Sequence, residues 1–209
     1  MLNFGFIKSE IDGSEHIFNY ENTTMPLPEE YSYINYMTKI INQGNEPICV
    51  PCSISAQLNW RKNIKDGIIE DNKINLHEIY DSRINKNENN GMTFKDALKF
   101  LRKEGVSCKE GKIKIDSYAM VTNNFALKYA ILSNGPCIGG LPVYNNNDTF
   151  WKQNFHDRFL GLHAVAIVGY NKDGFIIRNS WGKEYGKDGY SFISNSDFNK
   201  FVELWTIIG

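Results

Sequence analysis

The sequence predicts an α+β fold, with helices concentrated in the first half of the chain and short strands in the second. Helical periodicity with capping signals precedes residue 112, whereas the sequence after residue 136 consists of short apolar runs separated by polar turns. Strands and helices do not alternate along the chain, so a parallel sheet is not expected. We therefore expect two units: residues 1–112, a wrapping segment plus a helical lobe, and residues 113–209, a β-rich lobe.

The first 40 residues favour extended backbone rather than a regular element. The prolines of "PLPEE" at 26–30 bias the residues before them away from helix, so we expect this part to wrap around the rest. A helix is predicted to begin at Cys49, because Pro51 is tolerated in a first helical turn and apolar residues then recur at helical spacing.

Two further helices are predicted from their end signals. In "TFKDALKFLRKEG", Thr93 and Asp96 resemble a capping box and Gly105 can close the end. The stretch "NNFALKYAILSNGP" is expected to start at Asn123 or Asn124 and to stop at Gly135 and Pro136.

Strands are predicted for the β-rich runs of the second half. These runs are "CIGGLPVY", "HAVAIVGY", "GFIIRNS", "GYSFIS" and "LWTII", and the turn "NKDG" joins the second to the third. A hairpin is therefore expected across that turn.

The composition narrows the class of partner. Hydrophobic residues make up 42% and the net charge is -1, with Lys and Glu interspersed, so neither nucleic acid nor an anionic membrane is an expected partner. The start "MLNFGFIKSE" lacks the features of a secretory signal, and no apolar stretch is long enough to span a bilayer. We expect a cytoplasmic protein, or one associated with a virus or phage particle.

The stretch "ICVPCS" holds Cys49 and Cys52 and permits three interpretations. A redox pair at a helix start would have a stabilised thiolate, but "NQGNEPI" before it shows no strand. A structural zinc site would need a second close pair of ligands, which Cys108, Cys137 and the four histidines do not supply. We therefore expect no metal and no cofactor. The third interpretation is that one of the two cysteines is a nucleophile.

A nucleophilic cysteine needs a base, a group that orients the base and donors for an oxyanion. His163 opens one strand of the predicted hairpin and Asn179 closes the next, so the two ends lie side by side. Gln43, in the loop before the helix, and the N–H of Cys49 are candidate oxyanion donors. Taken singly, His163 could be a core histidine and Asn179 a turn residue.

These residues resemble those of the papain-like cysteine peptidases. "NQGNEPICVPCS" aligns without gaps with that family's nucleophile block, which gives Gln43 the oxyanion role and Cys49 the nucleophile role. "HAV...GY" and "NSWG...YG..GY" resemble the histidine and asparagine blocks, with His163, Asn179 and Trp181 at the matching positions. The chain is more similar to the short bacterial and viral members that lack a pro-domain.

The resemblance covers residues 26–208 and implies a fold and a mechanism. The implied fold is the papain-like two-lobed one, with a helical left lobe, an antiparallel β-barrel-like right lobe and the active site between them. The implied chemistry is peptide hydrolysis by a thiolate-imidazolium pair of Cys49 and His163, in which Trp181 shields the His-Asn contact from water. The partner is then a peptide or protein substrate.

The chain departs from the family around the nucleophile. Glu46 stands where relatives have a disulfide cysteine, and Pro47 and Ile48 replace a small Gly-Ser pair. Val50 replaces a tryptophan, and Cys52 stands in place of a phenylalanine on the buried side of the helix. We expect a cleft that is narrower or differently shaped.

Substrate contacts are predicted from the same resemblance. Gly91 and Met92 correspond to the stretch whose backbone grips an extended substrate, and Leu162 is a candidate for the pocket of the residue two before the cut. A turn glycine and a core leucine are equally good interpretations. Trp181 belongs to the candidate substrate-binding set, whereas Trp151 is expected to serve packing.

Two alternatives share this set of residues. One is a papain-fold structural or binding protein, such as a component of a virus or phage particle, with weak or no catalysis. The other is acyl transfer, such as peptide ligation. The stretch before residue 26 is also too short for the family's inhibitory pro-domain, so either no zymogen exists or the first residues lie across the cleft.

Overall fold

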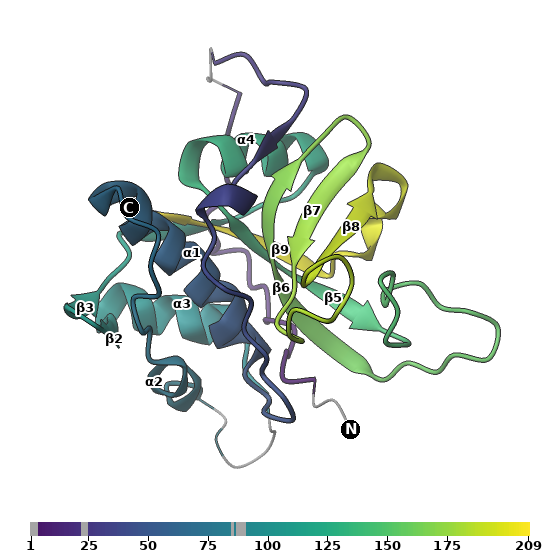
Figure 1. Cartoon of the computed structure of the whole chain (residues 1–209), viewed down its shortest axis with the longest axis horizontal. Coiled ribbons are helices and arrows are strands. Elements are labelled where there is room, and N and C mark those ends of the chain that lie inside the picture. The colour runs from purple at the N-terminus through teal and green to yellow at the C-terminus, as the bar shows by residue number, and fades with distance from the viewer. Residues whose placement is uncertain (1–3, 22–24, 85, 87–90) are drawn as a thin grey trace.

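Most helices lie on one side of the molecule and most strands on the other (Figure 1). The computed structural model describes residues 4–21, 25–84, 86 and 91–209. The α-helices are α1 (Cys49–Asp66), α2 (Leu76–Asp81), α3 (Phe94–Lys103) and α4 (Asn124–Asn134), and the 3-10 helices are η1 (Ile34–Tyr36) and η2 (Asn195–Lys200). Three of the helices, α1 to α3, lie in the first half of the chain, and the α+β class is confirmed.

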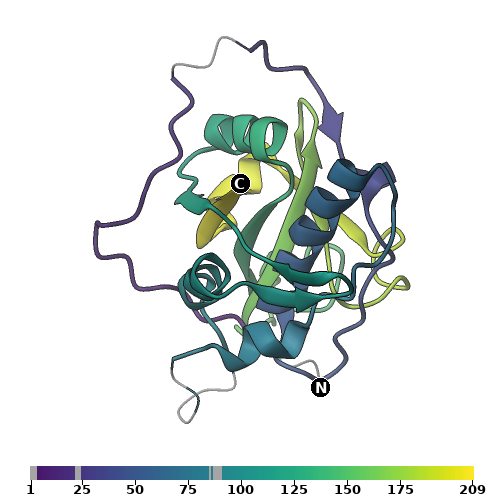
Figure 2. The same ribbon diagram turned by 90° about the vertical axis from the view of Figure 1, so that its left-hand side faces the viewer.

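The helix α1 lies between the two sides of the molecule, alongside β6 (Figure 2). It begins at Cys49 as predicted, carries Pro51 in its first turn and ends at Gly67, whose φ of 70° gives the left-handed conformation that closes many helices. Its first eleven residues are all buried, because both lobes pack on them.

The caps predicted for α3 and α4 are confirmed. Thr93 accepts from the N–H of Asp96 at 3.0 Å, and Asn123 accepts from the N–H of Ala126 at 2.8 Å. The short α2 was not predicted; the side chain of Asn75 caps it.

One antiparallel sheet forms most of the other side, in the order β4-β9-β5-β6-β7-β8, with β1 paired to β6. The five predicted strands are present, as β5 to β9. Strand β1, strand β4 and the separate hairpin of β2 and β3 were not predicted, because each has only two to four residues. The strands are β1 (Tyr31–Ser32), β2 (Val106–Cys108), β3 (Gly111–Ile113), β4 (Ser117–Met120), β5 (Cys137–Val143), β6 (Gly161–Tyr170), β7 (Gly174–Arg178), β8 (Tyr190–Ser194) and β9 (Glu203–Ile208).

The N-terminal segment, residues 4–18, runs over both sides of the molecule (Figure 2). Its far end lies along β4, where the N–H of Phe18 donates to Met120 at 2.9 Å and the N–H of Met120 donates to His16 at 2.7 Å. Its near end inserts Phe6 into the buried cluster formed by α1, α3 and the adjoining strands. The expected wrapping is confirmed for this segment, while the boundary near residue 112 stays a prediction.

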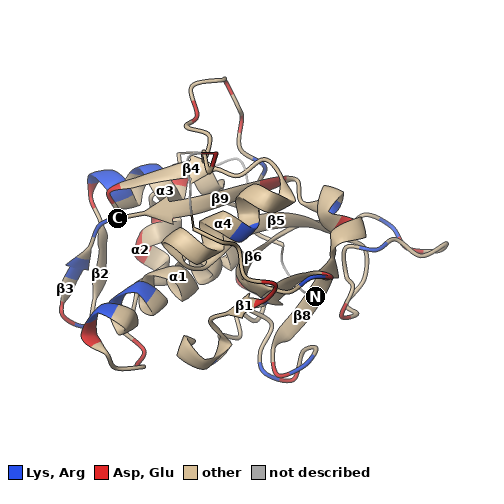
Figure 3. Ribbon diagram, turned by 90° about the horizontal axis from the view of Figure 1, so that it is seen from above, with Lys and Arg blue, Asp and Glu red and all other residues tan. Residues whose placement is uncertain are grey.

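Basic and acidic residues are interspersed along the elements (Figure 3). Within the described residues, no helix has the length and apolar character needed to cross a bilayer.

Candidate active site

The start of α1 holds the candidate nucleophile. Cys49 is the first helical residue and has no exposed surface. The N–H groups of a first helical turn have no partners within the helix, and the dipole is positive there, so this position can stabilise a thiolate or an oxyanion. Ile48 precedes it as the N-cap and is buried.

The strand β6 and the end of β7 bring His163 and Asn179 together. Nε2 of His163 and Oδ1 of Asn179 are 2.8 Å apart, and Oδ1 also accepts from the N–H of Ser180 at 2.7 Å. The Trp181 ring stacks on His163 with centroids 4.4 Å apart and an interplanar angle of 27°. The hairpin thus orients the imidazole as predicted and leaves Nδ1 as the nitrogen that could serve a thiol.

Gln43 is buried in the loop before α1, and it is held by Ser180, which follows the end of β7. Its Oε1 accepts from Ser180 Oγ at 2.6 Å and its backbone N–H donates to the Ser180 carbonyl at 2.9 Å. Its Nε2 donates to the carbonyl of Glu46 at 2.9 Å. Since Oε1 is bound by Ser180, Nε2 is the end of this amide suited to an oxyanion.

Comparison with known protein families identifies the family of the chain. The model described as "Papain family cysteine protease" matches residues 60–202, more than half of the chain. The chain belongs to this family. The match includes His163, Asn179 and Trp181 but begins after Gln43 and Cys49, so these two positions rest on the gap-free comparison of the sequence and on the geometry.

Curated papain-family relatives match at low identity. The chain is 26% identical to macrodontain-1 of Ananas macrodontes, over 72% of this chain and 69% of that protein. It is 23% identical to cathepsin J of Mus musculus, over 88% of this chain and 65% of that protein. The chain therefore spans about two thirds of the length of these two proteases.

Solved structures of the family have the same fold. Xylellain, a cysteine protease from Xylella fastidiosa, has a TM-score of 0.82 at 21% identity, with 99% of this chain and 96% of xylellain covered. Procathepsin B S9 from Trypanosoma congolense has a TM-score of 0.79 at 16% identity, with 99% and 86% covered. The papain-like two-lobed fold is confirmed.

The N-terminal segment lies directly over the candidate nucleophile. Gly5 is so close to the loop before α1 that a Cβ there would lie 2.0 Å from the carbonyl oxygen of Pro47. The N–H of Ile7 donates to Met92 at 3.0 Å, and the N–H of Met92 donates to Gly5 at 2.8 Å, in a parallel bridge. Within the described residues, the backbone of Gly5 and Ile7 thus lies between the loop before α1 and Met92.

The N-terminal segment over the site changes the charge state expected for Cys49 and His163. Burial raises the pKa of the Cys49 thiol to about 11, although hydrogen bonds from the backbone of Ala164 and Gly5 partly offset the effect. Burial also lowers the pKa of His163 to about 4, despite its bond to Asn179. The covered site therefore favours a neutral thiol and a neutral imidazole, not the expected thiolate-imidazolium pair, because the segment excludes water.

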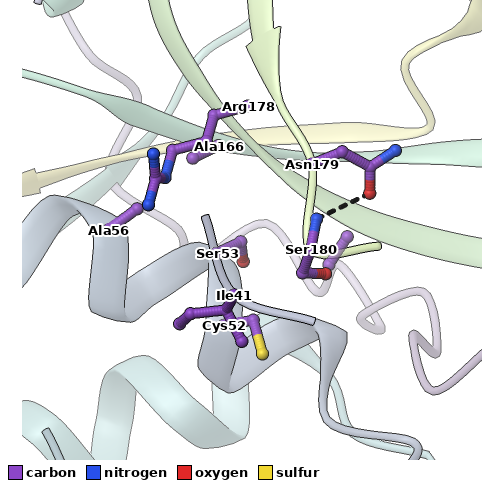
Figure 4. A pocket seen from close by; sticks show the side chains of 9 residues that line it. Ile41, Cys52, Ser53, Ala56, Ala166, Arg178, Asn179 and Ser180 are labelled. Carbon is purple, nitrogen blue, oxygen red and sulfur yellow. Dashed lines mark hydrogen bonds between the residues drawn. The ribbon is translucent and has the colours of Figure 1, made fainter. Parts of the chain in front are cut away.

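Cys52 lies on the buried side of α1, as expected for the position of a family phenylalanine. It borders a small cavity of about 10 Å³ between α1 and the strands, together with Arg178, Asn179 and Ser180 (Figure 4). Burial raises its pKa well above the usual value for a thiol. Both Cys49 and Cys52 are free thiols, and the described residues contain no cluster of three His, Cys, Asp or Glu that could hold a metal ion.

The predicted substrate contacts are occupied by the chain itself. Gly91 is buried, and a Cβ there would lie 2.7 Å from Cγ1 of Ile7. Met92 and the half-buried Leu162 belong to the same apolar cluster as Phe6. Trp151 is fully buried and donates to Asp197 at 3.3 Å, which confirms its packing role.

Sequence reasoning missed several residues that build the site. Ser180 holds both Gln43 and Asn179, and its place inside the Asn-Ser-Trp-Gly block was an available signal. Phe150 packs edge-on against Trp181 at 5.0 Å, but nothing in the local sequence marks it. The role of Gly5 depends on a contact with Pro47 that only the fold creates.

Proposed function

We propose that the chain is a cysteine endopeptidase in which Cys49 is the nucleophile, His163 the proton carrier and Asn179 the group that orients it. The observation that carries the proposal is the 2.8 Å contact between His163 and Asn179, which lies under Trp181 in a chain of the papain family. The oxyanion donors are Nε2 of Gln43 and the N–H of Cys49.

The chemistry follows from these roles. Cys49 transfers its proton to Nδ1 of His163, and the sulfur attacks the peptide carbonyl to form an oxyanion held by the two donors. Collapse of that intermediate breaks the C–N bond, and His163 gives its proton to the leaving amine. Water then attacks the thioester, with His163 taking its proton, which releases the acid and restores the thiol.

The N-terminal segment occupies this site in the wrong direction for cleavage. Since His163 must protonate the leaving amine, the C-terminal part of a substrate belongs on the Trp181 side and the N-terminal part on the Met92 side. The segment runs the other way: Phe4 packs against Trp181 with centroids 6.3 Å apart, and Phe6 bridges to Met92. We infer that the segment blocks the cleft without being cut, and that activity requires its displacement.

A single substitution tests both parts of the proposal. Gly5→Ala places a methyl group against the Pro47 carbonyl and should displace the segment. Under reducing conditions, the Gly5→Ala protein should cleave a mixed peptide library and the Gly5→Ala/Cys49→Ala protein should not. A folded Gly5→Ala protein with no cleavage, and with Cys49 open to alkylation, would favour the structural or binding alternative.

A further inference from the structure

Cys52 is a buried thiol that the proposed peptidase mechanism does not use. It lies three residues after Cys49 in α1, and both are free thiols. Its side chain borders the small cavity between α1 and the strands (Figure 4), and Ala164 of β6 also lines that cavity. The backbone of Ala164 forms a hydrogen bond with the Cys49 thiol as well. The two thiols therefore lie on the same side of α1, facing β6.

The first turn of α1 places the two cysteines at a separation that a disulfide can bridge. Residues three apart in an α-helix have Cα atoms about 5 Å apart, and disulfides join Cα atoms about 4.4 to 6.8 Å apart. The Cβ atoms must approach by roughly 1 Å, which tightening of the turn toward 3-10 geometry allows. Pro51 lies between the two cysteines and has no N–H, so the change breaks no hydrogen bond there. The cavity of about 10 Å³ beside Cys52 leaves room for its sulfur to turn.

The surroundings of the two thiols set the order in which they would react. Burial raises the pKa of the Cys52 thiol well above its usual value, and a charge on Cys49 raises it further. The Ser180 hydroxyl and the charge of Arg178 oppose this shift. Cys49, at the start of α1, is the thiol that can become a thiolate once the N-terminal segment is displaced. An oxidant therefore reacts with Cys49 first, and Cys52 reacts with the oxidised sulfur.

We propose that Cys52 is a resolving thiol, so that a hydroperoxide converts the pair into a reversible Cys49–Cys52 disulfide when the N-terminal segment is displaced. With hydrogen peroxide, the Cys49 thiolate attacks one oxygen; an S–O bond forms, the O–O bond breaks, and the other oxygen leaves as water after taking a proton. The sulfur of Cys52 then attacks the sulfur of Cys49. The S–S bond forms, the S–O bond breaks, and hydroxide leaves with the Cys52 proton as water. Two thiols and one peroxide thus give a disulfide and two water molecules.

The disulfide is a reversible block on the peptidase. It occupies the sulfur that serves as nucleophile, and the inference rests on the proposed function for this effect on activity, but not for the disulfide itself. Without a neighbouring thiol, the oxidised Cys49 sulfur would proceed to sulfinic and sulfonic acids, which dithiothreitol does not reduce. Cysteine stands here in place of the phenylalanine that the family has, so the device belongs to this chain's own departure from the family.

Mass spectrometry and activity test the two parts separately. The Gly5→Ala protein is treated with hydrogen peroxide, alkylated and digested with trypsin. Both cysteines fall in one tryptic peptide, residues 40–61, because Lys39 and Arg61 are the cleavage sites on either side. This peptide should lose two hydrogens, and dithiothreitol should restore both the thiols and the cleavage activity. The wild-type chain should form the disulfide at least about fivefold more slowly, because only the state with the segment displaced reacts.

Cys52→Ala in the Gly5→Ala background is the deciding variant. It should keep its peptidase activity before oxidation. After peroxide its peptide should gain oxygen atoms instead of losing hydrogens, and dithiothreitol should recover at least about tenfold less activity than in the Gly5→Ala protein. Cys108→Ala is the matched control, since Cys108 is a free thiol in β2, and it should behave as the Gly5→Ala protein does.

A Gly5→Ala peptide that never loses two hydrogens would overturn the proposal. Equal recovery in the Cys52→Ala and Cys108→Ala variants, or equally fast disulfide formation in the wild-type chain, would also overturn it. A reversible disulfide in a folded protein that cleaves no peptide would support the disulfide and count against the peptidase function.

Discussion

The N-terminal segment and the β5–β6 loop, residues 144–160, hold exposed and buried aromatic residues in opposite ways. Phe6 of the segment is 4% exposed, whereas Phe155 of the loop is 96% exposed. Phe6 packs against Phe94 with ring centroids 4.8 Å apart, whereas hydrogen bonds from Asn145 and Asn154 to Asp157 shape the part of the loop that carries Phe155. The segment is therefore held by buried packing, whereas the exposed part of the loop is shaped by its own hydrogen bonds.

The largest expected effect concerns Cys49, which the segment covers. In a Gly5→Ala background, Cys49→Ala should lower kcat/KM for a peptide substrate by at least about a thousandfold, because no other group can form the thioester. Cys52→Ala should largely preserve activity, since Cys52 lies on the buried side of α1. Equal losses in the two variants would favour the redox interpretation of the cysteine pair.

Displacing the segment should produce the next largest effect. Overpacking against backbone costs about 1 to 3 kcal/mol, so Gly5→Ala should raise peptidase activity over the wild-type chain by roughly 5- to 150-fold. Ile11→Ala, at an exposed position of the same segment, should leave activity unchanged. A Gly5→Ala protein no more active than wild type would show that the segment does not limit activity.

Acid should favour displacement of the N-terminal segment from the candidate active site. The covered site holds the pKa of His163 near 4, whereas an uncovered imidazole binds a proton at about 6.5. In a Cys49→Ala protein, where no thiol proton can pass to His163, the state with the segment displaced binds more protons between these values. The covered state is then fully stable above pH 6.5 and weakens as the pH falls, by roughly 30-fold at pH 5. Hydrogen exchange at the N–H groups of Ile7 and Met92, corrected for intrinsic rates, measures this opening, and His163→Asn should remove its acid dependence.

The smallest effect is expected at Ser9, whose hydrogen bonds to Glu203 fasten the segment to β9. The backbone N–H and Oγ of Ser9 donate to the buried carboxylate of Glu203 at 3.1 and 3.0 Å. Ser9→Ala removes one bond to a charged group, worth about 1.5 kcal/mol, and should raise activity roughly tenfold. Ser14→Ala, in an exposed turn, is the control, and a similar gain there would contradict an anchoring role for Ser9.

The sequence predicted the parts that depend on local patterns. Thr93 and Asn123 mark helix starts by capping, and the "NKDG" turn places His163 beside Asn179 because a hairpin has a fixed geometry. The state in which the segment covers Cys49 depends instead on contacts between residues far apart in the chain, such as Gly5 with Pro47. For the same reason, the neutral state of Cys49 and His163 could not be predicted, since it follows from burial and not from residue type.

The central claim is that the segment keeps Cys49 covered and neutral until it is displaced. The most direct test is the rate of Cys49 alkylation by iodoacetamide as a function of pH, measured by mass spectrometry in the wild-type and Gly5→Ala proteins. Labelling should be slow at neutral pH in the wild type, because the pKa of Cys49 is near 11, and rapid at and below neutral pH in Gly5→Ala. Identical pH profiles in the two proteins would contradict it.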